Sequence, residues 1–289
     1  MTKSWTILDL LDWTTKYFQD NSIDTPRLDA ECLLAHSLNV ERISLYLNFD
    51  KPIQEKERTE FRQLVSKRVT ERIPVAQLIG EKEFWSLKFK ITSDVLIPRP
   101  DTEILVSVAL EYLESLESQA EVLDIGTGSG ALAVAIANER SGVQVTATDI
   151  SGAALAVAEE NSIRHNLPDR IRFVAGDGLE AVSQKEFDLI VSNPPYLNSA
   201  DLKMLAPEIA HEPKIALLAG EQGTEILENI VSNANDYLKV GGCLALELGE
   251  SQAEQVAVWL ADEGFEKIEF HKDLAGRRRV VSGRKVRSD

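Results

Sequence analysis

The tetrapeptide Asn193-Pro194-Pro195-Tyr196 has the residue types needed to hold a planar NH2 group. It follows the apolar run 188–192, which we predict to be a buried strand. In open α/β sheets ligands bind at the carboxyl ends of the strands, so we expect Asn193 to reach a ligand. The Asn193 side-chain oxygen and the Pro194 carbonyl would accept the two N–H groups, and the Tyr196 ring would pack on the flat amide.

This arrangement suits methyl transfer to an amide nitrogen, which is a poor nucleophile because its lone pair is delocalised. Two acceptors would fix the nitrogen beside a methyl donor and stabilise the positive charge that develops on it. No covalent intermediate and no metal is expected. We predict catalytic roles for Asn193, Pro194 and Tyr196, and substrate binding by these three and Pro195. The alternative is a plain exit from a strand, since Asn-Pro often starts turns.

A glycine-rich segment, residues 124–131, leads from a second predicted strand into a helix. Glycines at such a junction let a ligand approach bare backbone, which indicates a nucleoside cofactor. The spacing also satisfies the dinucleotide fingerprint, and a tight turn without any ligand is a third possibility. Asp124 favours S-adenosylmethionine, because an acid there can hold the methionine amino group. The Asn193 loop also favours S-adenosylmethionine over a dinucleotide, because a dehydrogenase, which would use the dinucleotide, has no need of such a loop.

Acids at the ends of the next two predicted strands complete this cofactor site. Asp149 has the spacing of an acid that takes both ribose hydroxyls. Asp177 can accept from the adenine amine, although Asp177-Gly178 is also an ordinary turn sequence. The predicted cofactor-binding residues are Gly126, Thr127, Gly128, Ser129, Gly130, Asp149, Asp177, Gly178 and Asn193.

The surrounding pattern predicts the elements that position these residues. Helical periodicity dominates residues 1–73, with Thr25-Pro26 as a helix start. We predict a β-hairpin linker over 74–97, with its strands at 75–79 and 85–92 and its turn at Gly80, and a cofactor-binding domain over 98–289. Strands alternating with helices there indicate an α/β, Rossmann-like, mostly parallel sheet. Its seven predicted strands are 121–125, 143–148, 171–175, 187–192, 243–248, 265–270 and 279–282, the last two antiparallel.

Composition narrows the class of protein. The chain has 289 residues and a formal net charge of −16, which disfavours broad binding to nucleic acid or to anionic membranes. Two separated cysteines and four scattered histidines support neither a disulfide nor a metal site. With no signal peptide and no apolar run long enough to span a bilayer, a cytoplasmic location is expected.

Taken together, these motifs resemble the PrmC/HemK family of release factor glutamine methyltransferases. The resemblance also rests on the segments 97–103 (Ile-Pro-Arg-Pro-Asp-Thr-Glu), 212–213 (Glu-Pro) and 246–249 (Leu-Glu-Leu-Gly). It implies N5-methylation of the glutamine in the Gly-Gly-Gln loop of class-one peptide chain release factors. S-adenosyl-L-methionine would be the donor and S-adenosyl-L-homocysteine the product.

The resemblance further implies that Arg99 and Glu103 lie near the site, in roles left open. A methyltransferase that recognises a folded protein needs surface beyond its active site, so we predict that the N-terminal helical domain, with the hairpin, recognises the substrate. The alternative is that this domain only stabilises the fold. We expect a monomer that binds no nucleic acid directly and no membrane. One departure is Gly178, where several relatives carry a large side chain over the adenine; Leu179 could replace it. The alternative function is a nucleic-acid base amino-methyltransferase, which uses the same Asn-Pro-Pro-Tyr motif.

Overall fold

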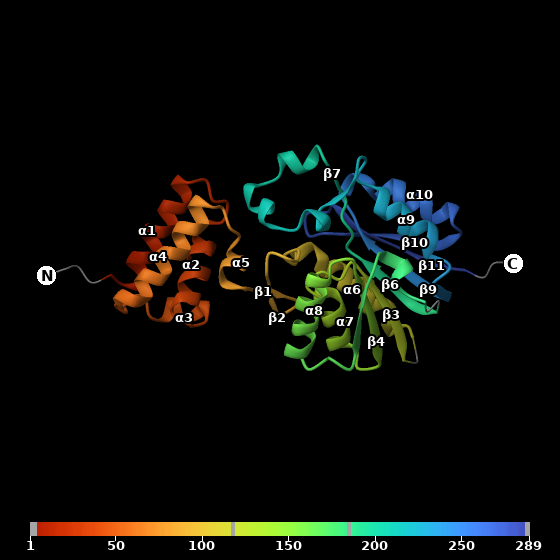
Figure 1. Cartoon of the computed structure of the whole chain (residues 1–289), viewed down its shortest axis with the longest axis horizontal. Coiled ribbons are helices and arrows are strands. Elements are labelled where there is room, and N and C mark those ends of the chain that lie inside the picture. The colour runs from red at the N-terminus through yellow and green to blue at the C-terminus, as the bar shows by residue number, and fades with distance from the viewer. Residues whose placement is uncertain (1–4, 117–118, 184–185, 287–289) are drawn as a thin grey trace. The chain divides into compact units, whose positions relative to one another are not determined.

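The computed structural model describes residues 5–116, 119–183 and 186–286. It divides into two compact units (Figure 1). The first comprises Met1–Glu81 and Ala206–His211, and the second comprises Lys82–Leu205 and Glu212–Asp289. The first unit is therefore discontinuous in sequence, which the chain's local patterns do not reveal.

The first unit is helical, as predicted. Its helices are α1 (Ile7–Asp20), α2 (Pro26–Ser37), α3 (Arg42–Leu47), α4 (Glu55–Thr70) and α5 (Val75–Ile79). Their apolar faces enclose one core around Leu11, Phe18, Leu33, Leu34 and Leu45, all without exposed surface. Thr25 does precede α2, but its hydroxyl makes no capping bond and donates instead to the Asp29 carboxylate at 2.7 Å.

A short segment from far along the chain completes this unit. The 3-10 helix η4 (Pro207–His211) brings Glu208 to the buried Arg68, whose Nη1 lies 2.7 Å from Glu208 Oε1. Arg68 Nε also donates to the Asp29 carboxylate at 2.8 Å. Arg72 makes a second ion pair with Glu208 at 2.8 Å. A buried guanidinium therefore depends on two carboxylates that stand almost 180 positions apart in the sequence.

Replacing Glu208 with alanine is expected to lower the free energy of unfolding by about 1–3 kcal/mol, because Arg68 loses a charged partner in a buried setting. Urea unfolding followed by circular dichroism would measure it. Glu60→Ala is the matched control, since Glu60 is exposed and lies 4.0 Å from Lys56. Equal stability of the two variants would contradict the expectation.

The hairpin differs from the prediction at its first strand. Residues Val75–Ile79 form helix α5, which ends at Gly80 with φ 74°. A short apolar run fits either a buried strand or a helix, so periodicity alone could not decide. The hairpin strands are β1 (Glu81–Phe84) and β2 (Leu87–Lys90). Between them Trp85 and Ser86 have φ of 52° and 57°, which is the two-residue turn that such hairpins favour.

The second unit contains the predicted seven-stranded sheet, in the order β10-β11-β9-β6-β3-β4-β5. The strands from β9 to β5 run parallel, whereas β11 is antiparallel to both β9 and β10. This confirms the Rossmann-like α/β class and the antiparallel end of the sheet. Its strands are β3 (Ala120–Ile125), β4 (Val143–Asp149), β5 (Ile171–Ala175), β6 (Phe187–Ser192), β9 (Leu238–Glu247), β10 (Phe265–Lys272) and β11 (Arg278–Lys285).

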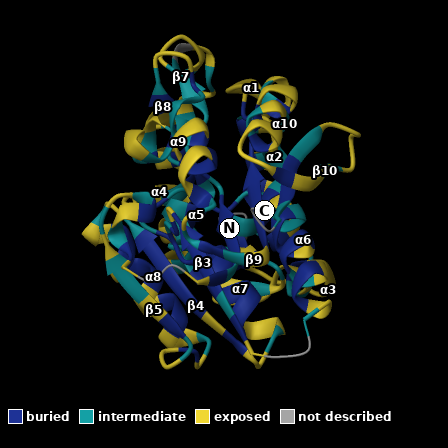
Figure 2. Ribbon diagram, turned by 90° about the vertical axis from the view of Figure 1, so that its right-hand side faces the viewer, coloured by how far each residue is buried: buried dark blue, intermediate teal, exposed yellow. Residues whose placement is uncertain are grey.

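Helices cover both faces of this sheet, which explains why its central strands are apolar throughout. One layer consists of α6 (Glu103–Glu114), α7 (Ala131–Glu139) and α8 (Gly152–Arg164), and the other of α9 (Glu225–Ala234) and α10 (Ala253–Asp262). Figure 2 shows the central strands buried and the outer helix surfaces exposed. On β3, Leu123 and Ile125 join the core under α9 and α10. Alternation along the strand places Asp124 on the opposite face.

Short elements occupy the loops. They are η1 (Pro100–Thr102), η2 (Gly178–Ala181), β7 (Leu197–Asn198), η3 (Asp201–Met204), η5 (Lys214–Ala216), β8 (Leu218–Gly220) and η6 (Glu250–Gln252). Within the described part of the chain, no helix has the length and apolar character to cross a bilayer, and no group of acidic, histidine or cysteine side chains is arranged to hold a metal ion.

Candidate functional site

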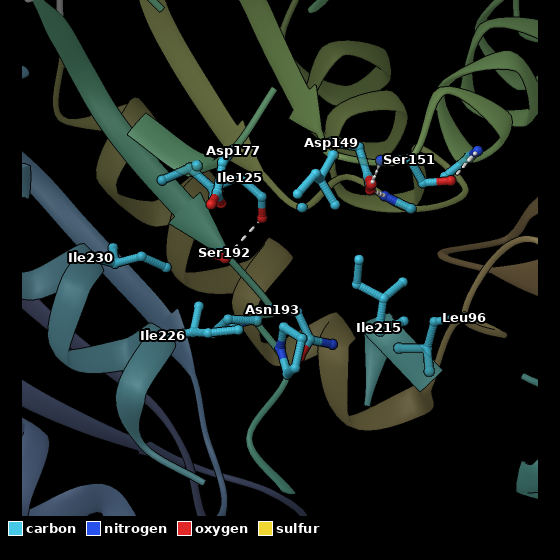
Figure 3. Close-up of a pocket in the computed structure, with 18 of the residues that line it drawn as sticks. Leu96, Ile125, Asp149, Ser151, Asp177, Ser192, Asn193, Ile215, Ile226 and Ile230 are labelled. Atoms are coloured by element: carbon cyan, nitrogen blue, oxygen red, sulfur yellow. Dashed lines mark hydrogen bonds between the residues drawn. The ribbon is translucent and has the colours of Figure 1, made fainter. Parts of the chain in front are cut away.

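A cavity of about 510 Å³ opens at the carboxyl ends of β3, β4 and β6. The predicted site residues that line it are Gly126, Gly128, Asp149, Asp177, Gly178, Asn193, Pro194 and Pro195. Figure 3 shows Asp177, Asp149 and Ser151 along one side of the cavity and Asn193, Leu96 and Ile215 across from them. Residues from the glycine loop and the Asn-Pro-Pro-Tyr loop therefore share one space.

The glycine loop exposes its backbone to this cavity. Gly126 and Gly128 have φ of 69° and 56°, and a Cβ added at either would meet no described atom within 4 Å. Gly130 has another role: it begins α7 with φ 79°, and a Cβ there would lie 3.1 Å from Ala158. The loop is therefore open on the ligand side and tightly packed behind.

Three of the predicted cofactor-binding residues, Thr127, Ser129 and Gly130, support the loop rather than line the cavity. The Thr127 hydroxyl donates to Asp124 Oδ2 at 2.6 Å. The Ser129 carbonyl accepts from Asn161 Nδ2 at 2.9 Å. Thr127 and Ser129 are buried, so their contacts with a cofactor remain predictions.

Asp149 joins the glycine loop to the start of α8. Its Oδ2 accepts from the Gly128 N–H and its Oδ1 from the Ser151 N–H, both at 2.9 Å. The carboxylate is partly exposed to the cavity. Because a carboxylate offers about four acceptor positions, two remain for the vicinal hydroxyls of a ribose.

Apolar side chains next to Asp149 and Gly178 in the sequence also line the cavity. Gly178 has φ 50° and carries no covering side chain, but Leu179 and Ile150 both line the cavity. Leu179 is buried, whereas Ile150 is 56% exposed although it is a large apolar residue. These two side chains, and not residue 178, are the ones available to cover an adenine, and that role remains a prediction.

Asp124 is completely buried behind the glycine loop, and its Oδ1 has no hydrogen-bond partner among the described residues. Burial raises the pKa of Asp124 to about 7, against the lowering effect of the hydrogen bond from Thr127. An unpaired buried carboxyl oxygen is costly unless a donor or cation approaches it. Asp124 does not line the cavity, so its contact with the amino group of a cofactor remains a prediction.

The raised pKa of Asp124 has a consequence for stability. The folded protein binds a proton between the usual aspartate pKa and about 7 that the unfolded chain does not bind. Stability should therefore fall as pH rises through this window, with each pKa unit corresponding to about 1.4 kcal/mol. Glu247, whose pKa burial also raises to about 7, acts in the same direction.

We expect the Asp124→Asn variant of the free protein to lose less stability between pH 6 and pH 8 than the parent. Urea unfolding at the two pH values would measure the difference. Asp262→Asn is the control, since Asp262 is exposed at the end of α10. If Asp124→Asn kept the full pH dependence, the assignment to Asp124 would be wrong.

Asn193 leaves β6 with its side chain anchored on one side. Its Nδ2 donates to Thr102 Oγ1 at 3.1 Å. The preceding Ser192 hydroxyl donates to the Ile125 carbonyl at 2.8 Å, which joins the ends of β6 and β3. With Nδ2 bound to Thr102, the side-chain oxygen is the group of the Asn193 amide left to accept from a ligand, and Asn193, Pro194 and Pro195 all line the cavity.

Tyr196 lies elsewhere. It packs on the core beneath α9 and α10 and does not line the cavity. Its backbone carbonyl accepts from Gln252 Nε2 at 3.0 Å. Its proposed contact with a flat amide remains a prediction, and the structure assigns the ring a packing role.

Comparison with known proteins identifies the family. Residues 9–80 match the PrmC N-terminal domain, and residues 102–221 match the Methyltransferase small domain. A release factor glutamine methyltransferase of Rhodopirellula baltica is 42% identical over 98% of this chain and 97% of its own. One from Geobacter sulfurreducens is 42% identical over 97% of each chain. This chain belongs to the release factor glutamine methyltransferase family.

The fold agrees with that assignment. A methyltransferase of Pyrococcus furiosus has a TM-score of 0.51 and 20% identity, covering 80% of this chain and 97% of that one. At that identity the likeness concerns the fold alone.

Two motif residues of the glutamine methyltransferase family, Arg99 and Glu103, lie outside the cavity lining. Arg99 pairs with the buried Glu212, whose Oε2 also accepts from the Ile97 N–H at 3.0 Å. Glu103 accepts from the Trp85 N–H at 3.0 Å. Glu212 thus joins the segment that contains Leu96 to the segment that begins at Pro213, and both segments line the cavity.

Sequence reasoning missed most of the apolar lining of this glutamine methyltransferase site. Those residues are Val95, Leu96, Ile125, Ile150, Ile215, Ala216, Ile226, Ile230 and Tyr237. In a sequence, such side chains cannot be told from core residues. Two of them, Ile150 and Ile215, are unusually exposed, at 56% and 55%, which appears only once the chain is folded. Others, such as Val95 and Ile230, are buried and have no such signal.

Proposed function

We propose that this chain methylates the side-chain amide nitrogen, N5, of the glutamine in the Gly-Gly-Gln motif of class-one peptide chain release factors, in the cytoplasm. The observation that carries the proposal is that Asn193, anchored through its Nδ2, shares a cavity with Gly126 and Asp149. Family membership supplies the protein substrate, and the cavity supplies the chemistry.

The residues fit S-adenosylmethionine as donor, which would supply an electrophilic methyl group on a sulfonium. Gly126 and Gly128 offer bare backbone, and Asp149 has acceptor positions for the ribose. Asp124 has an orphaned carboxyl oxygen suited to the amino group of the methionine part. Leu179 and Ile150 would cover the adenine, with Asp177 as acceptor for its amine.

The glutamine amide would be held by Asn193 Oδ1 and the Pro194 carbonyl, one for each N–H. These acceptors would orient the nitrogen for in-line attack on the methyl carbon. They would also stabilise the charge that the nitrogen gains as the C–N bond forms and the S–CH3 bond breaks, its electron pair remaining on sulfur. One N–H proton then leaves to water, so the amide regains its neutral form. Pro194 and Pro195 restrict the loop, because each fixes φ near −65°.

Mass spectrometry of a purified class-one release factor, incubated with this chain and the donor, would test the proposal. We expect a gain of one methyl group on the Gly-Gly-Gln glutamine. A faster reaction with the whole release factor than with a Gly-Gly-Gln peptide would support a recognition role for the first unit. Methyl label entering RNA or DNA, and not the release factor, would favour a base amino-methyltransferase instead.

A further inference from the structure

The side chain of Asn193 has two possible orientations, and only one serves the proposed reaction. With the oxygen toward the cavity, it accepts from the substrate amide. Turned by half a rotation, it presents an NH2 group to another NH2 group, and the two sets of donors repel. Some feature of the protein must hold the productive orientation.

We propose that Thr102 and Glu247 are positioning residues that keep the Asn193 oxygen turned toward the substrate. The inference rests on the proposed function, because the productive orientation is defined by an amide substrate. Thr102 comes from η1 and Glu247 from the end of β9, so neither belongs to the Asn-Pro-Pro-Tyr loop.

The three residues are brought together by the sheet. Ser192 on β6 is paired with Leu246 on the neighbouring strand β9. Asn193 directly follows Ser192 and Glu247 directly follows Leu246, so the sheet brings these two residues to neighbouring positions. Thr102 is 4% exposed and Glu247 is 2% exposed. Both lie behind Asn193 and outside the cavity lining, so neither can act on a substrate directly.

The hydrogen positions follow from counting donors. Thr102 Oγ1 accepts from Asn193 Nδ2, so the threonine's own hydrogen is directed elsewhere. The Glu247 carboxyl lies close enough to that hydroxyl for Thr102 to lower its pKa by hydrogen bonding, while Glu247 Oε2 has no partner in the described parts of the chain. A carboxylate can only accept, so an ionised Glu247 enforces the chain of donation from Asn193 to Thr102 to Glu247.

Protonation of Glu247 would reverse the direction of donation in these hydrogen bonds. A protonated carboxyl can donate to Thr102 Oγ1, which releases the threonine hydrogen to bond the Asn193 oxygen and favours the unproductive orientation. Burial raises the pKa of Glu247 to about 7, and the Thr102 bond opposes that rise. Asp101 raises it further, whereas Arg279 and Arg99 lower it.

One more titratable group faces this site. The Tyr196 phenol lies close enough to Glu247 for the carboxylate to raise the tyrosine's pKa, after the larger effect of burial. Tyr196 is thus neutral throughout the neutral range and does not supply the expected transition. Asp124 also has a pKa of about 7 in the free protein, but a bound ammonium group would keep it ionised. At saturating cofactor the acid limb of kcat should therefore follow Glu247.

The experiment compares Thr102→Val, Thr102→Ser and Glu247→Gln with the parent, using release factor as methyl acceptor and measuring kcat and the cofactor KM from pH 5.5 to 8.5. We expect Thr102→Val to lose about tenfold to a hundredfold in kcat with little change in cofactor KM, and Thr102→Ser to stay within about threefold of the parent. Glu247→Gln should lose the acid limb near pH 7. Glu250→Gln, on the exposed η6, is the matched control and should keep it.

Calorimetric binding of the cofactor to each variant reports folding independently of turnover. A well-folded Thr102→Val with parental kcat, or Glu247→Gln with an unchanged acid limb, would overturn the inference. So would equal losses in Thr102→Ser and Thr102→Val, because that would show packing and not hydrogen bonding. If instead the parent itself left the release factor unmethylated, the proposed function would fail first.

Discussion

An Asn193→Ala variant is expected to transfer methyl groups about a hundredfold to a thousandfold more slowly than the parent, while binding the cofactor within about an order of magnitude of the parental affinity. The side-chain oxygen acts mainly on the charge that develops in the transition state. The glycine loop and Asp149, which would hold the cofactor, remain intact. Single-turnover transfer from labelled donor to release factor gives the rate, and calorimetry gives the affinity.

Asn229→Ala is the matched control, because Asn229 lines the same cavity from α9 and lies away from the strand end. It should retain a rate within about tenfold of the parent. Near-parental transfer by Asn193→Ala would remove the proposed role of the amide oxygen. A selective loss of cofactor binding would instead make Asn193 a cofactor ligand alone.

The second large effect is expected at Asp149. Asp149→Asn should weaken cofactor binding by about tenfold to a hundredfold. The Asp149 carboxylate accepts from two N–H groups and would also accept from the ribose, whereas an amide offers only one acceptor oxygen. Its NH2 group would face either Gly128 N–H or Ser151 N–H, donor against donor. Calorimetric titration of the cofactor measures the change.

A matched comparison is Asp169→Asn, which removes the same charge at an exposed position before β5. Its affinity should equal that of the parent. If Asp149→Asn also bound the cofactor normally while the loop stayed folded, then the ribose would be held by other groups.

Much of the second unit could be predicted from the chain alone. Four of the parallel strands are mainly apolar runs bounded by polar or glycine residues, so β3, β4, β5 and β6 lie within a residue of their predicted ends. The fifth, β9, begins at Leu238, five residues before the predicted start at 243, because Lys239 and two glycines interrupt its apolar pattern. Since ligands bind at the carboxyl ends of such strands, the strand pattern was enough to place Asp149 and Asn193 at one edge of the sheet.

Other features depend on contacts that no local pattern contains. Val75–Ile79 forms a helix whose Val75, Leu78 and Ile79 pack against the core of the first unit, a contact that no local pattern contains. Five apolar-rich residues alone do not decide between helix and strand. The motif predicts Tyr196 as a substrate contact; its ring is partly buried against the core, and the contact remains a prediction. The link from Asn193 through Thr102 to Glu247 joins residues 91 and 145 positions apart, counted from Thr102 (193 − 102 and 247 − 102).

The segment 206–211 also determines how this protein can be dissected. A fragment that stops at residue 81 would retain Arg68 and Asp29 but lack Glu208, leaving a guanidinium that is 6% exposed short of one counter-charge. Chimeras that exchange the helical unit between relatives would carry the same defect unless they transplant both stretches of chain together. The helical unit is thus formed by two separate stretches of the chain, and the second stretch follows the Asn-Pro-Pro-Tyr motif.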